Sequence, residues 1–227
     1  MMRLDRKNFD KDNHSVVEKQ NRFSLNCIIF APRLHIYTST QLHNYTQMIN
    51  FLELVKKRQS DRAYLDKPVE KEKLEKILEA GRLAPSACNA QPWKFIVVTD
   101  PEKRMKIADA CSSRALGMNH FSKQAPVQLV LVEEKANFTS KFGGFVKQIH
   151  YPHLDLGIVA SHICLAAADE GVGSCMMGWL NEKKIRSILD IPGNKKVVLV
   201  ILLGYSTQSQ REKKRKSIDE IVGWDHY

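Results

Sequence analysis

The feature that most constrains the fold is the apolar run Val197–Leu203, which ends at Gly204. Its seven residues match the length of a β-strand and fall far below the ~20 residues that cross a bilayer. No convincing apolar run elsewhere is longer. We therefore expect a strand in the protein interior and no membrane-spanning segment.

Other strand-sized apolar runs alternate with segments of helical period. We predict strands at residues 94–99, 127–132 and 174–177, in addition to 197–203. Apolar residues at helical spacing, with Pro, acidic and Gly signals at the ends, predict helices over about 51–59, 68–81, 100–111, 153–170 and 181–191. Strands separated by helices, without an internal repeat, predict one mixed α/β or α+β domain.

Residues 1–47 differ from the rest, because they are polar and show no sustained period. They form either a poorly ordered arm or a stretch upstream of a true start at Met48. In both cases we predict that residues 48–227 form the functional domain, which is long enough for one substantial core.

Composition limits which classes of protein this chain can belong to. Five cysteines without close paired spacing argue against a disulfide scaffold and for a reducing, cytoplasmic setting. The formal net charge of +10 suggests nucleic acid, but a groove-reading helix would gather its basic residues on one face, and here they are spread. Two basic concentrations, residues 56–62 and 211–216, either converge on one small phosphate or form a solvated surface.

Four segments could carry chemistry, and each has a plainer structural alternative. Arg58–Arg62 offers two guanidinium groups and a hydroxyl to a phosphate monoester, unless it is only a charged helix end. Ala84–Trp93 presents polar groups to the edges of a planar heterocycle, or merely connects a helix to a strand. Gly171–Trp179 allows close backbone approach to a ligand, and Lys213–Val222 begins with a basic run. The plainer alternative for Gly171–Trp179 is a core strand with flanking turns, and for Lys213–Val222 it is a solvated tail.

The order and spacing of these segments resemble the nitroreductase family of FMN enzymes, from about Met48 to the C-terminus. The most specific part is the pattern Pro-Ser-x-x-Asn-x-Gln-Pro-Trp over residues 85–93. The resemblance implies an α+β fold, a three-layer sandwich in which helices flank a central, mostly antiparallel sheet. It also implies a homodimer that exchanges its C-terminal segment and closes over FMN.

The resemblance further implies a reaction. NADH or NADPH would reduce the flavin at N5, and a nitroaromatic, quinone or similar small-molecule acceptor would then take the electrons in a ping-pong mechanism. Because the flavin performs the redox chemistry, no catalytic side chain is expected. Neither nucleic acid nor a membrane is an expected partner.

Individual residues receive roles from the same resemblance. Arg62 would lie near N1/O2 of the ring, where negative charge builds on reduction. Gln59 departs from the Arg or His that is common at its position. The flexible side chains of Met176 and Met177 leave the shape of the substrate face undefined. The predicted cofactor-binding residues are Arg58, Gln59, Ser60 and Arg62; Pro85, Ser86 and Asn89 from the partner subunit; Met176, Met177 and Gly178 near N5; and Arg215 and Lys216 at the phosphate.

Several other interpretations stay open on the sequence alone. The chain could bind flavin without turnover, act as a reductive dehalogenase-like relative, or be a basic nucleic-acid-binding module. We expect no metal site, because in a possible cluster of His150, His153 and His162 the last two lie on different faces of one helix. Cys88 and Cys175 are expected to be small buried residues rather than redox thiols.

Overall fold

The computed structural model describes residues 50–113, 115–135 and 149–227. Residues 1–47 lie outside this range, so the predicted domain boundary and both interpretations of the leader stay predictions. Within the described ranges, no helix combines the length and the apolar character that a bilayer crossing requires.

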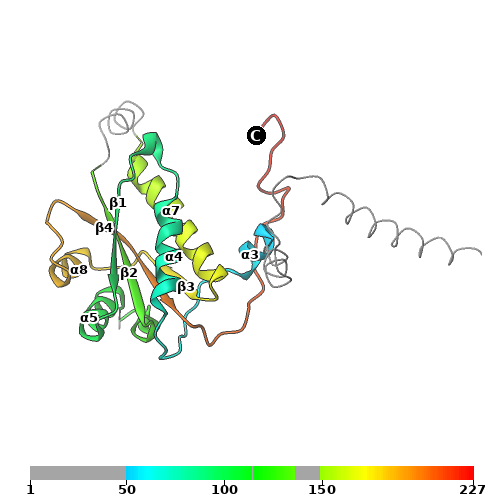
Figure 1. Ribbon diagram of the computed structural model, residues 1–227. Coiled ribbons are helices and arrows are strands. Elements are labelled where there is room, and N and C mark those ends of the chain that lie inside the picture. The colour runs from blue at the N-terminus through cyan, green and yellow to red at the C-terminus, as the bar shows by residue number, and fades with distance from the viewer. Residues whose placement is uncertain (1–49, 114, 136–148) are drawn as a thin grey trace, which may run out of the picture. The chain divides into compact units, whose positions relative to one another are not determined.

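A four-stranded antiparallel sheet forms the centre of the fold, as Figure 1 shows. The strands run in the spatial order β1-β2-β4-β3, and each neighbouring pair is antiparallel. One register shift interrupts the pairing of β2 with β4, between Leu131 and Val132. The strand bounds are β1 Trp93–Val98, β2 Val127–Glu133, β3 Gly173–Met177 and β4 Lys196–Gly204.

Helices cover both faces of the sheet and give three layers (Figure 1). Helices α4, Lys71–Arg82, and α7, Tyr151–Asp169, lie on one face, and α5, Pro101–Cys111, and α8, Glu182–Ile188, lie on the other. The short helix α3, Phe51–Lys57, and the 3-10 turns Ala87–Asn89 and His120–Gln124 complete the described elements. The predicted α+β sandwich is confirmed, whereas exchange of the C-terminal segment stays a prediction.

The two faces of the sheet bury separate hydrophobic clusters. Alternate side chains of a strand point to opposite faces, so Leu129 and Leu131 pack toward α7 while Val130 and Val132 pack toward α5. The same alternation divides the apolar run of β4, where Ile201 and its neighbours on both sides are fully buried. Burial on both faces explains why this segment is apolar throughout rather than alternately polar.

Gly81 permits α4 to pack closely on α7. A Cβ atom at this position would lie only 2.9 Å from Cγ1 of Ile163 and 3.2 Å from Cζ of Phe95. The predicted helix end near Gly81 is therefore also a packing position, since any larger residue would push the two helices apart.

Two details differ from the predictions. Helix α7 begins at Tyr151 rather than at His153, because Pro152 occupies the first turn, where a proline costs no hydrogen bond. Cys175 is buried as expected, but Cys88 is exposed, since it lies in the 3-10 turn outside both hydrophobic clusters.

Candidate functional site

The segment after α3 runs alongside β3 and sets the geometry of the basic region. Ser60 forms a parallel bridge with Ser174 of β3. The amide of Asp61 donates to the carbonyl of Ser174 at 2.9 Å, and the amide of Ser174 donates to Oδ2 of Asp61 at 3.3 Å. The side chains of Arg58–Arg62 are thereby held at the edge of the sheet.

The buried carboxylate of Asp61 holds this segment in place through hydrogen bonds. Asp61 is only 4% exposed, and its Oδ1 accepts a hydrogen bond from Nε2 of Gln59 at 2.9 Å. The hydroxyl of Tyr64 donates to the backbone carbonyl of Asp61 at 2.7 Å, and burial raises the pKa of Tyr64, so the phenol stays protonated. Gly173 leaves room for the carboxylate, because a Cβ there would lie 2.8 Å from Oδ2.

The chain returns to the same segment after β4. The amide of Thr207 donates to the carbonyl of Ala63 at 3.1 Å, and the amide of Arg62 donates to Oε1 of Gln208 at 2.7 Å. The amide of Arg211 donates to Oε1 of Gln59 at 3.0 Å. Gln59, the position where the sequence departs from the family pattern, thus joins the two segments through its amide group.

Side chains of the C-terminal segment complete the contact between the two basic stretches. Arg211 Nη2 donates to the carbonyl of Ser60, and Lys213 Nζ donates to the carbonyl of Arg58. The two stretches line an open cavity of about 340 Å³. Its lining residues are Arg58, Gln59, Ser60, Arg62, Arg211, Glu212, Lys213, Lys214 and Arg215.

This basic cavity carries a large excess of positive charge. Six of its nine lining residues are basic and one is acidic, so an anion is the ligand it fits. Burial and the neighbouring cations Arg58, Arg215 and Arg211 lower the pKa of Lys213, although Asp61 opposes the shift. An anion bound in the cavity would relieve the repulsion that this lowered pKa reflects.

A second cavity, of about 360 Å³, adjoins the first and shares Arg58 and Gln59 with it. Its remaining walls include the backbone before β3, from Gly171 to Ser174, and Tyr205 after β4. The glycine-rich segment predicted to approach a ligand therefore lines a cavity through its first half.

The predicted loop Pro85–Asn89 is held by hydrogen bonds and does not line either cavity of its own chain. Three residues without glycine's freedom have positive φ, namely Cys88 at 51°, Asn89 at 51° and Gln91 at 47°. The amide of Ala87 donates to Oδ1 of Asp155 in α7 at 3.0 Å, and the amide of Gln91 donates to Oγ of Ser86 at 3.0 Å. As far as described residues form the cavity walls, Pro85, Ser86 and Asn89 are absent from them.

The residues predicted near N5 also stand outside the described walls of both cavities. Met177 is 3% exposed and packs in the cluster between the sheet and α5, whereas Met176 is 41% exposed on the opposite side of β3. Gly178 has open space around its Cα, with the nearest atom, Cδ2 of Leu199, 3.9 Å from a built Cβ. Of the closing basic pair, Arg215 lines the basic cavity and Lys216 does not.

Sequence reasoning missed several residues of the site. Asp61 lies between the predicted Ser60 and Arg62, and its place between basic residues was the available signal. Arg211 and Lys213 belong to the basic concentration over residues 211–216, of which the sequence pattern predicted only Arg215 and Lys216 as phosphate ligands. The role of Asp155, which holds the Pro85–Asn89 loop, left no local signal because its partner is 68 residues away.

Comparisons with known proteins found a matching family and several relatives. A sequence model described as "Nitroreductase family" matches residues 55–205. A solved FMN-dependent nitroreductase from Clostridium difficile R20291 is 33% identical with a TM-score of 0.61, and the match covers 78% of this chain and 99% of that one. An oxygen-insensitive NADPH nitroreductase of Helicobacter pylori is 28% identical, over 66% of this chain and 84% of the relative. Rat iodotyrosine deiodinase 1 is 24% identical, over 76% of this chain and 68% of the relative.

The chain therefore belongs to the nitroreductase family. It is a flavin-dependent oxidoreductase of this family, whose fold is the sandwich described above.

Replacement of the buried carboxylate should weaken the scaffold of the basic cavity. Asp61→Ala should lower the free energy of unfolding by about 1–3 kcal/mol, because Gln59 Nε2 and the amide of Ser174 lose their acceptor. Urea unfolding followed by circular dichroism measures the change. Asp66→Ala is the matched control, since Asp66 is exposed and should change stability by less than about 0.5 kcal/mol. Equal losses in the two variants would contradict the role of Asp61.

Proposed function

We propose that this chain is an FMN-dependent NAD(P)H oxidoreductase that binds the ribityl phosphate of FMN in the basic cavity. One observation carries the proposal: Arg58, Ser60 and Arg215, predicted to meet at a phosphate, line the same cavity although 155 positions separate Ser60 from Arg215. Planar guanidinium groups match phosphate oxygens in geometry and in charge. The similarity to an FMN-dependent nitroreductase supports the same ligand.

Bound FMN would supply a hydride acceptor for NADH or NADPH and a donor for a nitroaromatic, quinone or similar acceptor. The chain's own residues bind and orient this group. Arg58, Ser60 and Arg215, together with Arg211 and Lys213, neutralise the phosphate. We assign Arg62 to the N1/O2 side of the ring, where a cation stabilises negative charge, and the backbone of residues 176–178 to the N5 side.

We further propose that the working unit is a homodimer. The ring needs apolar walls, and one chain leaves large apolar side chains exposed. Phe51 and Leu52 of α3 are 64% and 63% exposed, and Leu154 of α7 is 56% exposed. The C-terminal segment adds Ile218, Ile221 and Trp224 at 62–78% exposure. A second copy of the chain would cover these surfaces and bring Pro85, Ser86 and Asn89 to the ring.

The dimer makes flavin retention depend on protein concentration. Sedimentation velocity should show a dimer at micromolar concentration, and dilution to monomer should release flavin, which fluorescence detects as it becomes free. The two changes should coincide, because partner residues complete the site. A stable monomer that retains its full complement of flavin would refute this assembly.

One alternative acceptor chemistry has support from the comparisons. The similarity to rat iodotyrosine deiodinase 1 favours reductive dehalogenation as a second candidate on the same fold. Both candidates share the flavin and differ in the acceptor. Reoxidation of the reduced protein by a nitroaromatic, but not by a halogenated phenol, would select the nitroreductase activity.

Reduction of the flavin tests the function itself. The purified protein reconstituted with FMN should show absorption bands near about 370 and 450 nm, as expected for a flavin bound and electronically tuned by the protein. Under anaerobic conditions, NADH or NADPH should bleach these bands without any added acceptor, because reduction precedes acceptor binding. A colourless protein that FMN cannot reconstitute would refute the cofactor, and retained colour without bleaching would leave only a flavin-binding protein.

The phosphate assignment predicts a specific loss of affinity. Arg58→Ala should raise the Kd for FMN about 10- to 100-fold, because a charged hydrogen bond contributes about 1.5–3 kcal/mol. Fluorescence quenching of FMN measures the Kd. Lys103→Ala removes the same charge from the exposed surface of α5 and should leave the Kd unchanged. If both variants bind FMN as the parent does, Arg58 is only a surface charge.

A further inference from the structure

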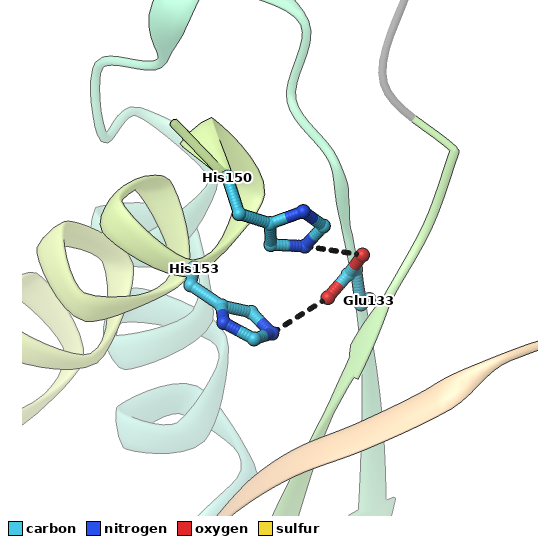
Figure 2. A group of neighbouring side chains, drawn as sticks. All are labelled: Glu133, His150 and His153. Carbon is cyan, nitrogen blue, oxygen red and sulfur yellow. Dashed lines mark hydrogen bonds and ion pairs between the residues drawn. The ribbon is translucent and has the colours of Figure 1, made fainter. Parts of the chain in front are cut away.

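A cluster of two histidines and one glutamate lies where the end of β2 meets the start of α7 (Figure 2), outside the described walls of both cavities. Glu133 is the last residue of β2, His150 is the N-cap of α7, and His153 lies in the first turn of α7. The three side chains each offer one ligand atom, and these atoms lie within 4.8 Å of one another. The fold has thus brought a strand end and a helix start to one point.

Hydrogen bonds satisfy only one of the two carboxylate oxygens of Glu133. Nε2 of His150 lies 2.9 Å from Oε1 of Glu133 with hydrogen-bond geometry. Nε2 of His153 lies 3.0 Å from Oε2 of Glu133, yet this contact lacks such geometry, and the buried Oε2 has no hydrogen-bond partner among the described residues. A buried carboxylate oxygen without a donor costs free energy unless a cation satisfies it.

Lys196 lies beside His153 and affects which role its ring nitrogen takes. Nζ of Lys196 lies 3.3 Å from Nε2 of His153, and an ammonium group can only donate. When Nε2 accepts this hydrogen bond, it carries a lone pair 3.0 Å from the unpaired carboxylate oxygen of Glu133. Two acceptors 3.0 Å apart repel, and a positive ion placed between them would bind both.

We propose that Glu133, His150 and His153 form a binding site for a divalent transition metal ion of the zinc type. Two imidazoles and one carboxylate are the ligand set that such ions take when three protein groups bind and water completes the tetrahedron. His150 and His153 are 56% and 42% exposed, which leaves room for that water. The ion replaces the strained contact, with each imidazole binding through a ring nitrogen and Glu133 through a carboxylate oxygen.

Two features of the surroundings weaken the affinity of the site for a cation. Lys196 and the positive end of the α7 dipole oppose a cation. Lys196 is exposed, so its flexible side chain can turn into solvent when the ion enters. These terms favour a site of moderate affinity rather than a permanently filled one.

The prediction that the chain has no metal site rested on His162, and the structure agrees that His162 stands apart. Its Nδ1 lies 2.9 Å from the carbonyl of Ile158 in its own helix. The missing ligand was Glu133, which no helical spacing could reveal. A bound ion would tie the end of β2 to the start of α7, the two elements that bracket residues 136–148.

Zinc titration of the full-length protein, loaded with FMN, freed of tags and stripped with a chelator, tests the site. Isothermal titration calorimetry should show one Zn²⁺ per chain with a Kd of about 1–10 μM. His150→Ala and His153→Ala should each weaken binding at least about ten-fold. Lys196→Met should tighten it, because a positive charge beside the ion is removed.

Matched variants separate this site from adventitious binding by other histidines. His162→Ala, on the same helix but outside the cluster, should bind zinc as the parent does. Glu133→Gln keeps the shape of the side chain and removes its charge, so it should weaken binding while the circular dichroism spectrum stays unchanged. Absence of stoichiometric binding, or undiminished binding by the His150→Ala/His153→Ala double variant, would overturn the proposal. Neither result depends on flavin reduction.

Discussion

The short bridge between Ser60 and Ser174, with the buried carboxylate of Asp61 behind it, is the interaction on which the site depends. It fixes a charged segment to the edge of β3, where helix α3 alone could not hold it, since α3 buries none of its residues. Once Arg58–Arg62 is fixed, its backbone carbonyls accept hydrogen bonds from Arg211 and Lys213 of the returning chain. A binding site is thus built from two surfaces that would otherwise repel each other.

Electrostatic repulsion among the basic side chains makes this arrangement suited to an anion. Six basic side chains around one small cavity raise the free energy of the empty protein, and a dianionic phosphate lowers it. The nitroreductase family, to which the chain belongs, supplies the class of ligand that fits. In the proposed dimer, the cationic segments of one chain would bind the phosphate. The apolar surfaces of α3, α7 and the C-terminus of two chains would cover the ring.

Much of the fold could be predicted from the sequence, because its elements depend on local periodicity. The run in β4, the helical spacing before Gly81 and the glycines after α7 are local signals, and each predicted element is present within a few residues. The positive φ values of Cys88, Asn89 and Gln91 gave no such signal, since none of these residues is glycine. Their conformation follows from contacts with Ser86 and Asp155 that the local sequence does not encode.

The site could be predicted only where residue type and spacing along the chain indicate a residue's role. Arg58, Ser60 and Arg215 could be named from order and spacing, and they line one cavity. The joining role of Gln59 and the position of Glu133 beside His150 depend on strand register and chain return, which fix contacts between residues up to 152 positions apart. Such contacts are tertiary, so a pattern along the chain cannot specify them.

We propose that two basic stretches, distant along the chain, hold one phosphate group. A crystal structure of the protein with FMN tests this most directly. We predict the ribityl phosphate in the basic cavity, with guanidinium nitrogens of Arg58 and Arg215 at charge-assisted hydrogen-bond distance of about 2.7–2.9 Å. A phosphate bound elsewhere, or contacted by only one of the two stretches, would contradict the claim.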